Sequence, residues 1–136
     1  MKNSLKKKTN KKGFTLVELI MVVALIAVLA AIAVPTVTNV ITTANENVDK
    51  SNAQTIELTL KTADAEIKAK TVTSLAADSK VSAVLAYYGV NISLTDKTKS
   101  DKYFAYKNKT VQLASASNST DPQVFSADTT LANFLS

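Results

Sequence analysis

The feature that most constrains the fold of this chain is an apolar run near its N-terminus. The 21 residues 14–34 contain only two polar side chains, Thr15 and Glu18. As an α-helix rising about 1.5 Å per residue, the run would be about 31 Å long, which matches the hydrocarbon thickness of a bilayer. A lone carboxylate there costs about 2.5–3.5 kcal/mol on insertion scales, so Glu18 needs a role or a partner. The sequence therefore predicts a membrane-spanning helix with a functional acid near its start.

Basic residues flank this run on one side. Six of the sixteen lysines precede it, and the next one, Lys50, comes well after its end. The positive-inside rule therefore places the N-terminus in the cytoplasm and residues 35–136 outside. The ten remaining lysines nearly balance the eleven acidic residues. The basic isoelectric point thus reflects the six lysines before the apolar run and says little about binding partners.

The chain contains no cysteine and no histidine. No disulfide can form, and the usual thiolate and imidazole ligands for metals are missing, as are the common pairs of nucleophile and base. We therefore expect no enzymatic activity, no cofactor and no resident metal ion.

The apolar run and its leader resemble a known family of precursors. The segment Lys12-Gly13-Phe14-Thr15-Leu16-Val17-Glu18-Leu19, with the lysines before it and Pro35 after it, is similar to the cleavage site of prepilins, the precursors of type IV pilins and pseudopilins. The resemblance covers about residues 6–35. It implies that a membrane peptidase removes residues 1–13 by cutting between Gly13 and Phe14, and N-methylates Phe14. It also implies that Glu18 pairs with the terminal amine of a neighbouring subunit, and that the partners are other pilin subunits, the prepilin peptidase, the pilus assembly platform and the membrane.

Two other interpretations of the N-terminus remain open. Ala31-Ile32-Ala33 has the small-x-small form of a secretory cleavage site, which would release a protein that begins at Val34. Against this, Glu18 would interrupt the apolar core of such a signal. A plain uncleaved anchor that retains Met1 is the other alternative.

Beyond the membrane-spanning half, 14–34, the pattern becomes amphipathic. Apolar residues recur at three-, four- and eight-residue steps, which predicts that one helix runs from Phe14 to about Lys70. The stripe consists of Val37, Val40, Ile41, Ala44, Val48, Ile56, Leu60, Ala63 and Ile67. We expect its part from Val48 to Ile67 to face the core of the external domain, and its earlier part to contact other subunits. Many Thr, Asn and Ser residues make 35–52 the weakest stretch of this amphipathic spine, 35–70.

Pro35 removes one helical hydrogen bond and clashes with the preceding turn, at a cost of about 3 kcal/mol. It predicts a point where the helix kinks or melts when subunits pack together. A structural kink without a role in assembly, or a helix start at the membrane exit, would explain the same residue.

Residues 71–136 predict a small head with a short antiparallel sheet, so that the whole chain is of the α+β class. A short helix should follow the caps Asp78 and Ser79 and end before Gly89. Strands are expected at 103–107, 109–114 and 123–126, with a hairpin turn at Asn108 and polar loops at 91–102 and 115–122. Asp128 should cap a final helical turn that carries Leu131, Phe134 and Leu135. Because 66 residues without a disulfide have little core of their own, we expect the head to pack on the long helix.

Three patterns in the head have a possible binding role. Basic and aromatic residues alternate as in single-strand nucleic-acid surfaces, but acids lie among them, so we expect a solvated face and no nucleic-acid binding. These residues are Lys97, Lys99, Lys102, Tyr103, Tyr106, Lys107 and Lys109. Thr120, Asp121, Ser126 and Asp128 could offer oxygen ligands to calcium, but without the spacing of a recognised site. Asn91, Asn108 and Asn118 each begin an Asn-x-Ser/Thr triplet, which we interpret as a mark of loops rather than of glycosylation.

The sequence favours a structural subunit of a type IV pilus, stored in the cytoplasmic membrane and polymerised into a surface filament for adhesion, aggregation or twitching. A pseudopilin of a type II secretion-like or competence DNA-uptake apparatus would carry the same N-terminal residues. A monomeric secreted or membrane-anchored protein is the third possibility.

Overall fold

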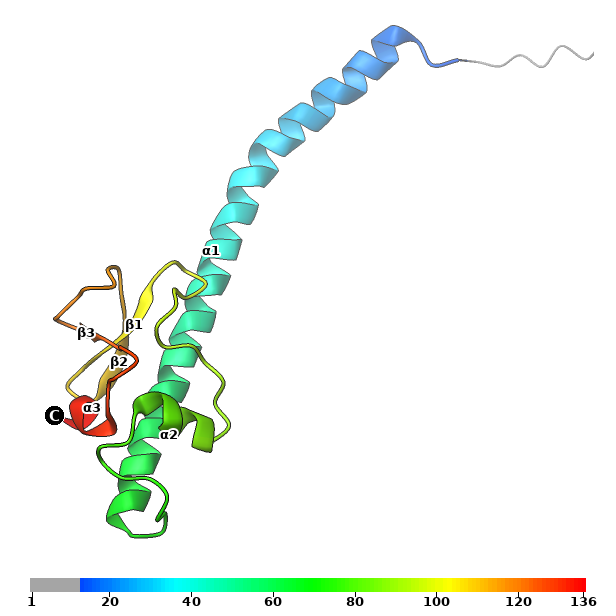
Figure 1. Ribbon diagram of the computed structural model, residues 1–136. Helices are drawn as coiled ribbons and strands as arrows, with labels where there is room; N and C mark the ends of the chain where they lie inside the picture. The colour runs from blue at the N-terminus through cyan, green and yellow to red at the C-terminus, as the bar shows by residue number, and fades with distance from the viewer. Residues whose placement is uncertain (1–12) are drawn as a thin grey trace, which may run out of the picture. The chain divides into compact units, whose positions relative to one another are not determined.

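The computed structural model describes residues 13–136; the leader residues 1–12 lie outside the described part (Figure 1). A long helix, α1 (Leu16–Lys68), is followed by α2 (Val81–Tyr87) and two strands, β1 (Tyr103–Lys107) and β2 (Thr110–Ala114). A two-residue strand, β3 (Gln123–Val124), and a short helix, α3 (Leu131–Leu135), complete the chain. The predicted α+β class, with a long N-terminal helix and a small antiparallel sheet, is confirmed. The chain divides into two units, Met1–Asn39 and Val40–Ser136, and α1 contributes to both.

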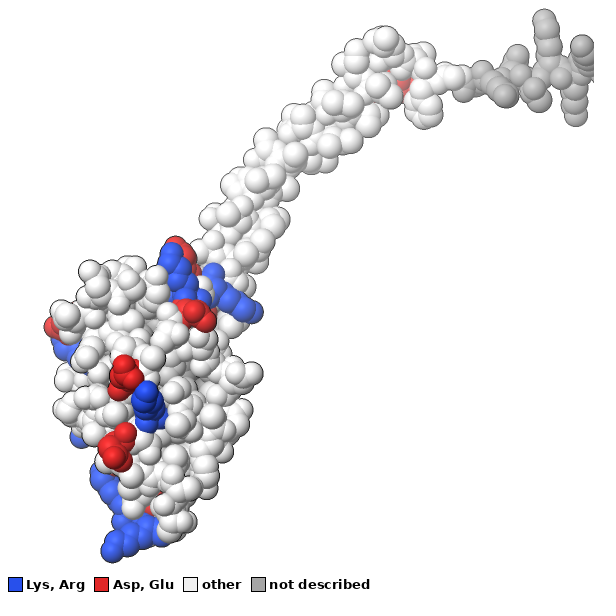
Figure 2. Space-filling model, in the orientation of Figure 1, with Lys and Arg blue, Asp and Glu red and all other residues white. Residues whose placement is uncertain are grey.

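In the first unit, the described chain is α1 up to Asn39, preceded by three non-helical residues, Gly13 to Thr15. Every large apolar side chain that the structure describes in this unit is exposed, from Phe14 and Leu16 through Val37. The surface of this helical segment is almost free of charge (Figure 2). Since a soluble protein rarely leaves so much contiguous apolar surface in water, this part of α1 needs a lipid or protein environment.

The polar stretch of α1 after Pro35 is helical without a break. Threonine hydroxyls along the helix donate to the carbonyl oxygen four residues earlier, as Thr36 does to Ile32 at 3.1 Å and Thr59 to Thr55 at 2.8 Å. These bonds satisfy hydroxyl groups that would otherwise compete for the backbone in non-helical conformations. The stretch 35–52, in which we expected low helix propensity, is part of one continuous helix.

The second unit places a three-stranded antiparallel sheet, in the order β2-β1-β3, beside the second half of α1 (Figure 1). The hairpin pairs Tyr103 with Ala114 at one end and Lys107 with Thr110 at the other. The two-residue turn between the strands, Asn108 and Lys109, has positive φ at both positions, as a type I′ turn requires. Lys109 thus belongs to the turn, and the prediction that it begins the second strand was wrong by one residue.

One hydrophobic core joins α1 to the head, as expected for a head too small to stand alone. The four apolar side chains that α1 contributes are at most 5 % exposed: Ala53, Ile56, Leu60 and Ala63. The head contributes Leu75, Val81, Val84, Leu85, Leu94, Phe104, Tyr106, Val111, Phe125, Leu131 and Phe134.

The predicted core stripe of α1 was wrong at its beginning. Val48 is 39 % exposed, whereas its neighbour Asp49 is only 1 % exposed. Positions 49, 53, 56, 60 and 63 keep a strict alternation of four- and three-residue steps, so they lie on one face of the helix. Val48 is rotated by about 100° from that face. It was assigned to the stripe because it is apolar and follows Ala44 at a four-residue step.

Two predicted helix caps were also wrong. Lys80, not Asp78 or Ser79, precedes α2, and its side chain makes no capping hydrogen bond. Thr130, not Asp128, caps α3, and it forms a capping box with Asn133. Asp128 instead forms an ion pair with Lys80 at 2.8 Å.

The predicted end of α2 is confirmed. Gly89 has a φ of +72°, the left-handed conformation that glycine adopts without strain. The N–H of Gly89 donates to Ala86 and that of Val90 to Leu85, which together make a Schellman motif.

The third strand ends at Val124, two residues earlier than predicted. Phe125, which follows it, is buried in the core, and its N–H donates to the carbonyl of Phe104 at 3.1 Å.

Candidate functional site

The predicted cleavage segment lies just outside the first turn of α1. Gly13 and Phe14 are non-helical, and Phe14 is 81 % exposed. A Cβ added at Gly13 would meet no heavy atom within 4 Å, so the packing of the described chain does not require glycine at this position. The bond between Gly13 and Phe14 is thus accessible. If glycine is required at position 13, the requirement would come from an enzyme that binds this bond and not from the fold of the chain.

Thr15 marks where the helix begins. Its hydroxyl oxygen accepts from the N–H of Glu18 at 3.3 Å, and its carbonyl accepts from the N–H of Leu19 at 3.2 Å. These are the two bonds expected of an N-cap residue, which satisfies an otherwise unpaired donor of the first turn. Thr15-Leu16-Val17-Glu18 also has the Thr-x-x-Glu spacing of a capping box, a signal that our sequence interpretation of Glu18 did not use.

Glu18 occupies the first turn of α1, where the helix dipole favours negative charge. Among the described residues before Glu46, it is the only charged side chain. The place of Glu18 at the helix start therefore allows two roles at once: compensation of the helix dipole within its own chain, and attraction of a cation from another.

Pro35 lies inside α1, well after its first residue Leu16, and the helix continues on both sides of it. Because proline has no N–H, it offers no hydrogen bond to the carbonyl of Ala31. The predicted role of Pro35 as a kink in assembly stays a prediction.

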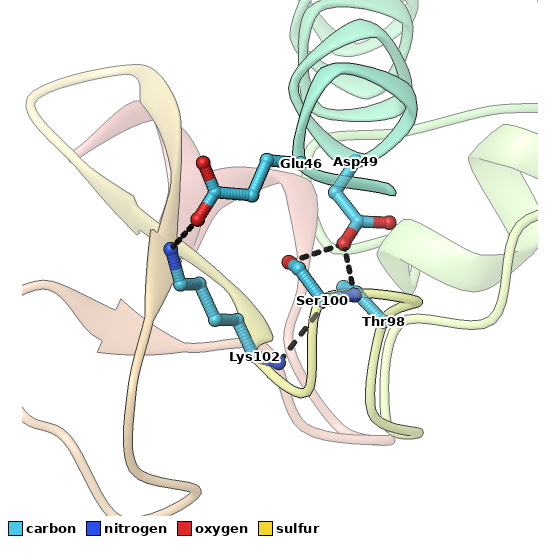
Figure 3. Close-up of polar contacts among 5 residues, drawn as sticks. All are labelled: Glu46, Asp49, Thr98, Ser100 and Lys102. Atoms are coloured by element: carbon cyan, nitrogen blue, oxygen red, sulfur yellow. Dashed lines mark hydrogen bonds and ion pairs between the residues drawn. The ribbon is translucent and has the colours of Figure 1, made fainter. Parts of the chain in front are cut away.

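In the second unit, four carboxylates of α1 hold different segments of the head; we call Glu46, Asp49, Glu57 and Glu66 the carboxylate ladder. The first two bind the loop before β1 (Figure 3). Asp49 accepts from the N–H of Lys99 at 3.2 Å, and from the N–H of Ser100 at 2.7 Å and its hydroxyl. Glu46, one turn earlier, forms an ion pair with Lys102 at 3.3 Å.

The loop that Asp49 binds is itself a closed turn. The N–H of Asp101 donates to the carbonyl of Thr98 at 3.1 Å, and Asp101 has a φ of +61°. This turn directs two successive backbone N–H groups at one carboxylate, which is the arrangement of an anion-binding nest. Burial alone would raise the pKa of Asp49, but the hydrogen bonds from Ser100, Thr98 and Lys99 outweigh it and hold the pKa below its ordinary value. Asp49 is therefore charged and fully hydrogen-bonded inside the fold.

The other two carboxylates of the ladder bind the sheet and α2. Glu57 accepts from the N–H of Val111 on β2 at 3.0 Å. Its hydrogen bond with Lys61 contributes most to a pKa below the ordinary value for glutamate. Glu66 accepts from the Tyr88 hydroxyl, and this bond raises the pKa of Tyr88 to about 12. Since Val111 lies on an edge strand, Glu57 also occupies a backbone donor that could otherwise pair with another chain.

Three of the five lysines in the basic and aromatic pattern of the head are paired with acids. Lys97 pairs with Asp101 at 2.7 Å, and Lys107 pairs with Asp121 at 2.8 Å. Lys102 is held by Glu46, and Tyr106 is buried in the core. Local ion pairs of this kind cancel the long-range field that steers phosphate backbones.

The possible calcium ligands are likewise engaged elsewhere. Asp121 binds Lys107 and Asp128 binds Lys80, and neither pair shares a residue with the other. Within residues 13–136, no group of three or more acidic side chains is close enough to hold a metal ion.

A scan against protein-family models matches residues 8–34 to the prokaryotic N-terminal methylation motif. Together with the long apolar helix, this match supports a type IV pilin-like protein. In its first half, α1 is long and apolar enough to cross a membrane, as a prepilin anchor must be. Searches of the curated proteins and of the solved structures gave no significant match.

Proposed function

We propose that this protein is a structural subunit of a type IV pilus and not an enzyme. The observation that carries the proposal is the methylation motif at 8–34, which coincides with an exposed Gly13–Phe14 bond and with an apolar helix that bears one acid in its first turn. The subunit waits in the cytoplasmic membrane with its N-terminus inside. Cleavage after Gly13 frees the Phe14 amine, which is then N-methylated, and the assembly platform moves the subunit into an extracellular filament.

The exposed apolar surface of α1 up to Val37 supports this route, because lipid and a bundle of like helices are two environments that can bury it in turn. Inside such a bundle an unpaired Glu18 would carry a desolvation cost of several kcal/mol. A methylated ammonium from Phe14 of the next subunit compensates much of this cost, and only in one register. Glu18 thus sets the axial position of each new subunit.

A pseudopilin of a secretion or DNA-uptake apparatus would share these N-terminal residues. Two observations in the head support the pilus over that alternative. Three of the five lysines that could bind DNA are paired with acids. Asp121 and Asp128, candidate calcium ligands of the kind some pseudopilins carry in a C-terminal loop, are each bound to a lysine.

Replacement of Glu18 tests the pairing role. Glu18→Gln loses the charge but keeps a side chain that can complete the capping box, whereas Glu18→Ala loses both. We expect both variants to insert and to be cleaved, yet to give at least tenfold fewer sheared filaments than the wild type, counted by electron microscopy. Glu18→Asp, which keeps the charge on a shorter side chain, is the matched control and should retain more filaments than Glu18→Gln. Filaments of Glu18→Gln at wild-type abundance would contradict the pairing role.

Mass spectrometry of the protein from cells tests the class itself. A chain that begins at methylated Phe14 supports the proposal, whereas Val34 or Met1 at the N-terminus would replace it by a secreted or an uncleaved anchored protein. Electron microscopy of cells with and without the gene then separates a surface pilus from a short pseudopilus.

A further inference from the structure

We propose that Thr15 is a positioning residue for leader removal: its N-cap holds the start of α1 at Leu16, so that the Gly13–Phe14 bond stays outside the helix and open to the peptidase. This inference rests on the proposed processing of the leader. Thr15 lies on the C-terminal side of the Gly13–Phe14 bond, outside the leader, and takes no chemical part in the cleavage of this bond.

The hydrogen bonds of Thr15 fix the start of α1. The hydroxyl of Thr15 binds the N–H of Glu18, and the carbonyl of Thr15 accepts the first helical bond, from Leu19. A residue in this place has a non-helical backbone, so the chain before it leaves the helix. Gly13 and Phe14 are non-helical, in agreement with this boundary.

Gly13, two residues before Thr15, is an alternative N-cap. Glycine is about as good an N-cap as threonine, whereas alanine and valine are poor ones. Without the Thr15 hydroxyl, Gly13 becomes the best cap near the start of the apolar run. The helix would then begin at Phe14, and the Gly13–Phe14 peptide bond would join its first turn.

The consequence for a peptidase follows from backbone geometry. A bond in the first turn has a fixed helical conformation, and its carbonyl is engaged in the helix, so an enzyme must unwind that turn before it can act. Shifting the helix start also rotates every side chain of the first turn relative to the scissile bond. The N-cap at Thr15 thus fixes the position of the Glu18 side chain relative to the Gly13–Phe14 bond.

Processing of Thr15 variants of the full chain, in membranes that contain the peptidase, tests this inference. Thr15→Val keeps the branched shape but loses the acceptor, and Thr15→Ala loses both. Thr15→Ser, Thr15→Asn and Thr15→Asp change the shape but keep a capping oxygen. We expect the initial rate of leader removal to fall about two- to thirty-fold in the Val and Ala variants, the range that follows from the usual cost of losing an N-cap, and to stay near wild type in the other three. The amount of membrane-inserted precursor should be equal in all of them.

A second measurement follows the backbone directly. In isotopically labelled precursor in detergent micelles, the Cα chemical shift of Phe14 should move toward helical values in Thr15→Val but not in Thr15→Ser. A Thr15→Val precursor that is cleaved at the wild-type rate would overturn the inference. So would Ser, Asn and Asp variants that are as slow as Val, because the peptidase would then be recognising the side chain itself.

Failure of the inference differs from failure of the proposed function. If the wild-type chain is not cut after Gly13 at all, the proposed function and the inference fall together. If the wild type is cut and Thr15→Val is cut equally fast, the inference alone fails.

Discussion

Asp49 is the residue whose replacement should most weaken the attachment of the head to α1. Asp49 is 1 % exposed, and its carboxylate accepts three hydrogen bonds from Lys99 and Ser100. A hydrogen bond to a charged group contributes about 1.5–3 kcal/mol, and a buried donor left without its partner costs about 1–3 kcal/mol. The three contributions are not additive, because the loop donors lie near the surface and water can replace part of what is lost.

We therefore expect Asp49→Ala to lower the free energy of unfolding of residues 40–136 by about 3 kcal/mol. For a domain of this size, that corresponds to a fall of about 12–24 °C in the melting temperature. All four tyrosines of the chain lie in this unit, and the chain has no tryptophan. Tyrosine fluorescence of the full chain in detergent micelles thus reports unfolding of the head without interference from the apolar half of α1.

Asp64→Ala is the matched control on the same helix. Asp64 makes an ion pair with Lys68 one turn away, a type of surface pair that contributes about 0.3–0.5 kcal/mol. Its loss should change the free energy of unfolding by less than about 0.5 kcal/mol. If Asp49→Ala were no more destabilising than Asp64→Ala, the loop would not depend on this carboxylate and the reasoning would be refuted.

Two further predictions concern the stability of the head at low pH and the conformation of the hairpin turn. Because the folded-state pKa of Asp49 lies below its ordinary value of 3.8, its contribution to stability is complete above about pH 4 and is lost as the pH falls through the folded-state value. Urea titrations between pH 2 and 6 should therefore show a steeper loss of stability below about pH 4 in the wild type than in Asp49→Asn, and parallel curves would contradict this account. Lys109 has a φ of +61° in the hairpin turn, so Lys109→Gly should raise the free energy of unfolding by about 1 kcal/mol, whereas Lys107→Gly, in β1, should lower it. Equal effects of the two glycines in a denaturant titration would show that the turn conformation carries no strain.

The apolar first part of α1 was predicted correctly from the sequence alone. A run of apolar residues with one acid, a lysine-rich leader and a Gly13–Phe14 junction are local patterns, and a helix that meets lipid needs no partner from elsewhere in the chain to form. The end of α2 was equally local, since Gly89 alone can adopt the left-handed conformation there without strain. The N-cap role of Thr15 was also predictable from the sequence, because Thr15 and Glu18 have the Thr-x-x-Glu spacing of a capping box. Our sequence interpretation used these residues only as part of the prepilin resemblance.

The helix caps of the head were harder to predict because several candidates compete within a few residues. Asp78, Ser79 and Asp128 are all good capping residues by type. Lys80 and Thr130 nevertheless hold the cap positions, because they are joined to each other by an isolated bridge that fixes where α2 and α3 begin. A contact between residues fifty positions apart therefore overrode the local preference.

By itself, the sequence determined that the chain has a membrane-competent helix with one acid in its first turn, an amphipathic continuation and a small α+β head. Only the tertiary structure decided that Asp49 turns inward while Val48 remains exposed, and that acids of α1 bind backbone groups of the head. The physical reason is that a charged side chain is buried only when its hydrogen-bond partners are already in place, and the partners of Asp49 come from a loop fifty residues later in the chain. Hydrophobic periodicity records which face of a helix is apolar, but it contains no information about a carboxylate whose burial depends on a distant turn.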